Sequence, residues 1–166
     1  MTLDNDDVIS VLNDLIQTSR DGINGFRTAA GSVKNSDAKA VFTTRVQLIE
    51  RAASELEGEV RRLGGDPDRH GSVAGSVHRG WINLKSAITG KDDEAIIAEC
   101  ERGEDVAVKH YEDALKKDLP TPLRLIVQRQ YEGTLQNRDK VRALKGPAGT
   151  SSTRSRTADR DALPPT

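Results

Sequence analysis

Residues 42–63 read FTTRVQLIERAASELEGEVRRL, and an apolar residue returns at every seventh position of this segment. The repeat and the apolar positions beside it are Phe42, Val46, Ile49, Ala53, Leu56, Val60 and Leu63. Such a stripe predicts an amphipathic helix that packs against other helices, with Arg45 and Glu59 at the edge of the stripe. Gly64-Gly65-Asp66-Pro67 ends the helix, because glycine accepts the left-handed C-terminal position and proline cannot continue a helix.

Four more segments have the same helical spacing, and turn residues separate them. The predicted helices span about residues 5–33, 36–63, 72–88, 93–117 and 122–144, and Ser36 or Asp37 is expected to cap the second. Short turns make the first two helices one antiparallel hairpin and the last two another. The third helix covers roughly 26 Å at about 1.5 Å per residue, so it can carry the chain back along the bundle.

We therefore predict an all-α fold, namely a ferritin-like four-helix bundle with a helical crossover between the second and fourth helices. A plain up-and-down arrangement of five helices is the alternative. Residues 1–145 form the predicted bundle domain. Residues 146–166 are rich in Gly, Pro, Ser, Thr and Arg and contain one large apolar residue, Leu163, so we expect a flexible, disordered tail.

Composition narrows the class of protein. The 166 residues suit one domain, and 25 Lys and Arg against 26 Asp and Glu leave no strong field to attract nucleic acid or an anionic membrane. The single cysteine, Cys100, excludes an internal disulfide framework and is expected to be a buried apolar residue. The acidic start has no signal-peptide pattern, and no apolar run reaches about 18 residues. We expect a soluble, cytoplasmic protein.

Several short motifs carry a resemblance to a known family. They are Asp21-Gly22, Gly25-Phe26, residues 63–67, Gly71-Ser72-Val73-Ala74-Gly75, residues 78–81, residues 99–104 and Arg129-Gln130-Tyr131. Together they resemble a bacterial, proteobacterial-type family of small ferritin-like four-helix-bundle proteins with no assigned function, over about residues 8–145. The resemblance implies the crossover topology and a cytoplasmic setting. This chain departs from the family pattern at Arg138, near which the family has a histidine.

A ferritin-like di-iron centre needs a Glu from each of two helices and a Glu-x-x-His pair from each of the other two. The sequence contains no Glu-x-x-His pair. Ser19 and Gly22 occupy the inward midpoint of the first helix, and small or aliphatic residues occupy that of the second. Only the fourth helix keeps candidate ligands, which are Glu101, Glu104 and His110. A degenerate site for iron or another divalent metal would use these three residues, completed across a dimer.

The inward carboxylates can also be stabilised without a metal. An ion pair between Arg138 and Glu101 is the favoured arrangement, because a guanidinium holds a carboxylate by two hydrogen bonds. Partial exposure at the bundle surface would serve as well. Antiparallel pairing places Glu104 near Thr134 and His110 near Gln130, so we expect a structural polar layer of Ser19, Gln130, Thr134 and Arg138. Small residues at Ser19, Gly22, Gly103 and Thr134 could leave a ligand cavity in the same layer.

These observations favour a non-catalytic protein. No phosphate loop, nucleophile elbow or catalytic triad order is present, so we expect no enzyme and no cofactor. The main hypothesis is an oligomer-forming ferritin-like bundle with a stress-associated role, and the alternative is a divergent divalent-metal (iron) binding protein. We expect a homodimer, because Val73, Val77 and Trp81 on the crossover helix need cover. The sequence identifies no physiological partner.

Overall fold

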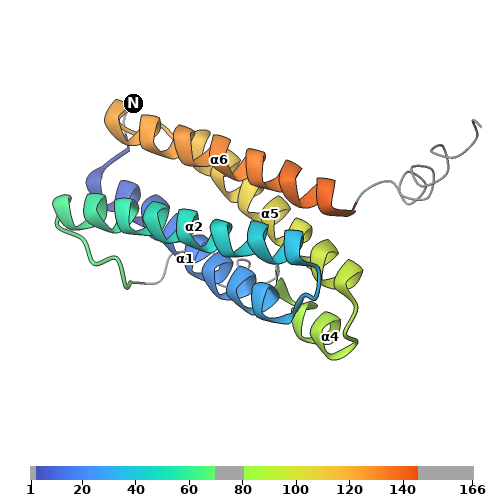
Figure 1. The fold of residues 1–166 in the computed structure, drawn as a ribbon. Helices are drawn as coiled ribbons and strands as arrows, with labels where there is room; N and C mark the ends of the chain where they lie inside the picture. The colour runs from blue at the N-terminus through green and yellow to red at the C-terminus, as the bar shows by residue number, and fades with distance from the viewer. Residues whose placement is uncertain (1–2, 70–80, 146–166) are drawn as a thin grey trace, which may run out of the picture.

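The computed structural model describes residues 3–69 and 81–145, and the regular elements in these ranges are all helices (Figure 1). They are α1 Asn5–Ser32, α2 Ser36–Arg62, α4 Leu84–Thr89, α5 Asp93–Leu115 and α6 Thr121–Lys145. None of these helices is long and apolar enough to cross a membrane. The predicted tail, residues 146–166, lies outside the described residues.

The four long helices form two antiparallel hairpins, α1 with α2 and α5 with α6. The hairpins pack together through α1 against α5 and through α2 against α6. Figure 1 shows that α2 ends at one end of the bundle and α5 begins at the other, so the connection between them has its two ends at opposite ends of the bundle. This is the predicted ferritin-like crossover, and the predicted fold class is confirmed.

The crossover helix differs from its prediction in extent. Of the predicted helix 72–88, residues 72–80 lie outside the described residues, and the described part is helical only as α4, which packs against α1 and α5 at one end of the bundle. The plain five-helix alternative does not hold, because α1 packs against α5 and α2 against α6, so the four long helices close into a bundle with one another. α4 begins at Leu84 because the carboxylate of Glu99 accepts the backbone N–H of Asn83 and fixes the turn before the helix.

Short polar side chains set where the long helices begin. Asp4, Asn35 and Asp92 accept a backbone N–H of the first turn of α1, α2 and α5, at 2.8, 2.9 and 3.0 Å. The cap of α2 is therefore Asn35, and the predicted caps Ser36 and Asp37 are the first residues of the helix itself. The amide oxygen of Asn35 already satisfies the exposed donor, so the helix starts one residue earlier than a Ser36 cap requires.

The apolar core of the described bundle is divided into two clusters. One, toward α4, contains Phe26, Phe42, Val46, Ile49, Ile96, Cys100 and Val141. The other, toward the α5–α6 turn, contains Leu12, Leu15, Ile16, Leu56, Val60, Leu123 and Val127. Buried polar side chains lie between them, namely Ser19, Arg45, Glu104, Thr134 and Asn137. The centre of the bundle is therefore polar, and its two ends are apolar.

Trp81 closes one side of the bundle from the crossover connection. Its indole ring lies edge-on to Phe26, with ring centroids 5.0 Å apart and an interplanar angle of 77°. The ring fits because Gly25 on α1 and Gly103 on α5 have no side chains, and a Cβ at either position would meet it at 2.4–2.5 Å. The Trp81 ring is thus packed against its own chain. Of the three residues expected to need cover by a partner chain, Trp81 is the one that the structure describes, and it does not require a partner.

We predict that Gly103→Ala destabilises the fold by about 1–3 kcal/mol, because the new methyl group would overlap the Trp81 ring and force it to move. Chemical denaturation measures the change. The matched control is Gly58→Ala in α2, where an added Cβ meets nothing within 4 Å. The control should gain roughly 0.5–1 kcal/mol from helix propensity. Equal effects of the two substitutions would contradict this role of Gly103.

Candidate functional site

An ion pair between Arg45 and Glu104 lies at the centre of the bundle. The guanidinium Nη2 is 3.2 Å from Glu104 Oε2, and the Nε and Nη2 groups donate to Oε1 at 3.4 and 3.3 Å. The two side chains are 9% and 2% exposed. Arg45 is on α2 and Glu104 on α5, and these helices are diagonally opposite because each packs mainly against α1 and α6. The ion pair therefore crosses the interior of the bundle.

Helix α6 supplies the remaining partners of this ion pair. Thr134 accepts a hydrogen bond from Arg45 Nη2 at 3.3 Å, and the Asn137 amide donates to Glu104 Oε2 at 3.3 Å. Burying a charge is unfavourable unless it is paired and hydrogen-bonded, and this arrangement meets both conditions. Three of the four long helices thus hold one charged pair.

A second set of hydrogen bonds extends the polar layer by one turn. The Tyr111 hydroxyl donates to Gln130 Oε1 at 2.9 Å, and the Gln130 amide donates to Glu55 Oε1 at 2.9 Å. Glu55 also pairs with Arg129 at 2.7 Å, at the surface of the groove between α2 and α6. Burial raises the pKa of Tyr111 to about 12, so this hydroxyl keeps its proton and acts as a donor at neutral pH.

The electrostatics of the centre depend on Glu104. Burial raises the pKa of this carboxyl, and the charge of Arg45 and the hydrogen bond from Asn137 oppose that effect. Burial also raises the pKa of the nearby Cys100 thiol, and the charges of Glu104 and Glu99 add to the increase. Cys100 is fully buried, as predicted, and its raised pKa makes it an unreactive thiol.

A cavity of about 450 Å³ opens between α2 and α6 and reaches the ion pair. The four residues predicted to leave such a space, Ser19, Gly22, Gly103 and Thr134, all line it. Its mouth is formed by exposed side chains, which include Leu48 and Arg51 on α2 and Arg129 and Lys140 on α6. The polar centre is thus accessible from one side of the bundle.

The predicted pair of Glu101 with Arg138 is wrong. Glu101 is bound at the surface by Arg142 at 2.7 Å and Lys145 at 2.8 Å, while Arg138 lies 3.5 Å from Asp105. Side chains lean toward the N-terminus of their own helix, so residues that meet across an antiparallel pair are displaced by about one turn from symmetric positions. The bonds from Lys145 and Arg142 lower the pKa of Glu101.

The predicted residues separate into three places. Ser19, Gln130, Thr134 and Glu104 all line the central cavity, whereas Arg138 does not line it and pairs with Asp105. His110 faces α1, where its Nδ1 lies 2.9 Å from the Thr18 hydroxyl. The Thr18 hydroxyl also lies 3.0 Å from the carbonyl oxygen of Asp14, so it links His110 to the backbone of α1. Glu101, Glu104 and His110 therefore do not converge on one point.

The residues present do not fit a metal centre of the ferritin type. Two described carboxylates line the cavity, and both are already bound: Glu104 by the cation Arg45, and Glu55, one turn away, by Arg129 and Gln130. A fixed positive charge repels a second cation from the same oxygens. Among the described residues, no three histidine, cysteine or acidic side chains are grouped so that they could hold a metal ion.

Arg45 is the one residue of the central ion pair that the sequence does not identify, because the apolar pattern of α2 places it only at the edge of the apolar stripe. Its signal was its spacing, three residues after Phe42 and four before Ile49, which is the spacing of core positions. Antiparallel pairing of α5 with α6 predicts only neighbours on α6 for Glu104, such as Thr134. An arginine side chain is long enough to reach α5 from the diagonally opposite helix α2. The spacing of residues along one helix does not indicate which of the other helices such a long side chain will contact.

Four long helices, a lengthwise crossover and a polar centre together define a ferritin-like bundle protein. A family model described as a domain of unknown function, DUF2383, matches residues 7–117. The chain belongs to this family. No curated protein matches the chain.

Among solved structures, the chain is similar to a two-domain protein from Anabaena variabilis that contains DJ-1/ThiJ/PfpI-like and ferritin-like domains. The TM-score is 0.71 at 13% sequence identity, and the match covers 99% of this chain. It covers 42% of the other chain, so this chain spans less than half of that protein. At this identity the similarity shows the fold alone.

We predict that His110 makes stability depend on pH. Burial lowers the pKa of His110 below 6.5, so the folded state favours the neutral ring. The stabilising contribution is complete above the unfolded-state pKa and is lost as the pH falls through the folded-state pKa. The wild type should therefore lose unfolding free energy relative to His110→Asn between pH 7.5 and pH 5, measured by urea denaturation. A constant difference between the two proteins would contradict the prediction.

Proposed function

We propose that this protein is a non-catalytic ferritin-like binding module in which an ion pair stands where related folds hold metal. The observation that carries the proposal is the Arg45–Glu104 pair, buried across the centre and completed by Thr134 and Asn137. These contacts use both carboxylate oxygens of Glu104. What the bundle retains is an accessible cavity lined with polar groups.

The lack of catalytic function is supported by the protonation state of the central groups. A nucleophile or general base must be readily ionised and must have a neighbour that accepts or supplies a proton. Burial keeps Tyr111 and Cys100 protonated, and Glu104 is occupied by Arg45. No described contact bears on the stress-associated role expected from the sequence.

A divergent binding site for iron or another divalent metal is the weaker alternative. Of its predicted ligands, only Glu104 faces the central cavity, while Glu101 is bound by two basic side chains and His110 contacts α1. The alternative therefore requires both Arg45 and the His110 ring to move before a cation could bind.

The homodimer and the cytoplasmic location belong to the same proposal. The location is supported by the single buried cysteine, which suits a reducing compartment. The dimer is supported by Ile82 in the crossover connection, which is 68% exposed. The crossover residues Val73 and Val77, from which a dimer is expected, lie outside the described residues. An exposed aliphatic side chain at the edge of an apolar sequence suits a contact between two copies.

The proposal predicts that protein purified without chelator contains far less than one equivalent of iron or other divalent metal per chain. Elemental analysis gives the content, and the variant Glu104→Gln, which keeps the size of the side chain, should leave it unchanged. Glu101→Gln is the matched control on the same helix. Near-stoichiometric metal that is lost in Glu104→Gln and kept in Glu101→Gln would refute the proposal in favour of the metal-binding alternative.

The dimer is predicted separately. Light scattering at micromolar concentration should give twice the mass of one chain, and Ile82→Lys should return the protein to the mass of a monomer. Leu125→Lys, at another exposed aliphatic residue that is 64% accessible, is the control and should remain dimeric. A monomeric wild type would end this part of the proposal and leave the metal question untouched.

A further inference from the structure

We propose that the central cavity binds a small organic carboxylate, with the acid group at Arg45 and the apolar body along Leu48, Ile49 and Ala52. This inference rests on the proposed function, because a metal ion on Glu104 would displace the arginine that the ligand needs. The volume of about 450 Å³ lies within the range of small-molecule sites. One open side, between α2 and α6, gives the ligand a path to the ion pair.

The charge of the cavity favours an anion. Its basic lining residues are Arg45, Arg51, Arg129 and Lys140, and its acidic lining residues are Glu55 and Glu104. The cavity thus has an excess of two positive charges on a chain whose formal net charge is −1. A local excess of one sign attracts ligands of the other sign.

The inner end offers donors suited to a carboxylate. The bonds from Arg45 to Glu104 and Thr134 engage Nε and Nη2, so within the described chain the Nη1 amine is the part of the guanidinium left for a ligand. These bonds, at 3.3–3.4 Å, are longer than the usual 2.7–2.9 Å of charge-assisted pairs. The guanidinium is therefore held in place without being saturated.

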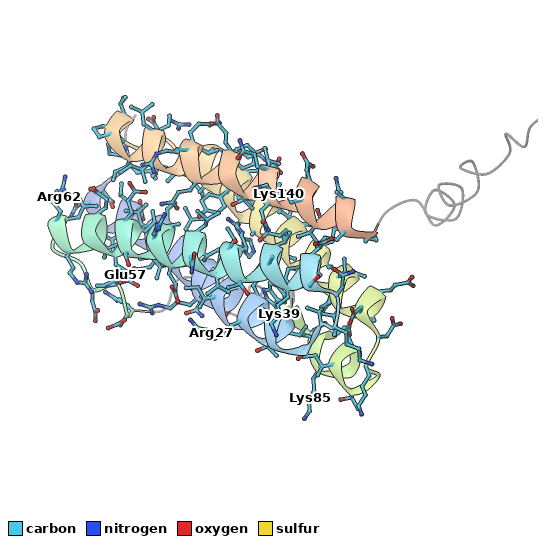
Figure 2. All side chains as sticks on the ribbon, viewed as in Figure 1. Arg27, Lys39, Glu57, Arg62, Lys85 and Lys140 are labelled. Atoms are coloured by element: carbon cyan, nitrogen blue, oxygen red, sulfur yellow. The ribbon has the colours of Figure 1, made fainter. Side chains whose placement is uncertain are left out.

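The mouth provides a second source of attraction. Arg51 and Lys140 are exposed and form no ion pair within the described ranges, in contrast to Arg129, which is bound by Glu55. Figure 2 places Lys140 on α6, the helix that packs against α2, which carries Arg51. Two unpaired cations at an entrance raise the local concentration of anions.

The α2 wall between the mouth and the centre is apolar, and the far wall of the cavity contains a natural reporter. Leu48, Ile49 and Ala52 line the α2 side, and Trp81 lines the cavity from the opposite side, between α1 and α5. Leu48 is 42% exposed, so it has apolar surface available for a ligand. Trp81 is the single tryptophan of the chain, so a ligand in the cavity should change the only indole fluorescence of the protein.

The test is a titration of the full chain with sodium octanoate, followed by the fluorescence of Trp81 and by calorimetry. Octanoate should bind saturably at one site per chain. Octanamide, which has the same body without the charge, should bind at least about tenfold more weakly, since a hydrogen bond between two charged groups is stronger than one to a neutral amide. Inorganic phosphate should bind more weakly than octanoate because it lacks the apolar body.

Two variants locate the site. Gly133→Leu places a side chain into the open space of the cavity, where an added Cβ meets nothing within 4 Å, and should abolish binding. Gly58→Leu is the matched control, because that helical glycine also has open space and does not line the cavity. The double variant Arg45→Met/Glu104→Met replaces the ion pair by apolar side chains of similar size, which buried pairs often tolerate, and should also lose binding.

Three results would overturn the inference. They are no saturable binding of octanoate, equal binding of octanoate and octanamide, and equal loss of binding in Gly133→Leu and Gly58→Leu. Equal binding of phosphate would overturn the apolar part of the assignment. A metal-free protein that does not bind octanoate refutes this inference alone, whereas metal held by Glu104 refutes the proposed function as well.

Discussion

Moving a guanidinium and a carboxylate from water into the interior of a bundle is unfavourable by several kcal/mol per ion, and the surroundings of Arg45 and Glu104 offset that penalty. Thr134 and Asn137 are polar because each satisfies one member of the pair. The apolar core is divided for the same reason, since aliphatic residues at this level would leave the charges without hydrogen bonds. The cavity follows, because side chains that serve the ion pair do not fill the space beside it.

The crossover connection takes part in this centre as well as joining two hairpins. Trp81 reaches between α1 and α5 only because Gly25 and Gly103 provide room, and its ring then forms one wall of the cavity. Phe26 supports the ring from the apolar side. A connection that merely spanned the bundle would need none of these contacts. The position of the site therefore depends on a residue outside the four long helices.

The sequence predicted the long helices and their order well, because seven-residue apolar repeats and turn residues are local signals. It also predicted that Glu104 is buried, that Cys100 is an inert core residue and that small residues leave a cavity. It misassigned the partner of Glu101 because the lean of side chains shifts contacts by a turn. It did not identify Arg45 as the partner of Glu104, since a bond between diagonal helices depends on three-dimensional packing.

Helices whose apolar residues repeat every seven positions can pack against one another in more than one axial register. The ion pair between Arg45 and Glu104 favours one register. Shifting α5 by seven residues along its axis would place Glu104 opposite aliphatic side chains and leave both buried charges without a partner. We infer that Arg45 and Glu104 fix the axial register of the helices. The burial of two charges lowers the stability of the folded bundle, but it also ensures that the apolar clusters at the two ends pack in one arrangement.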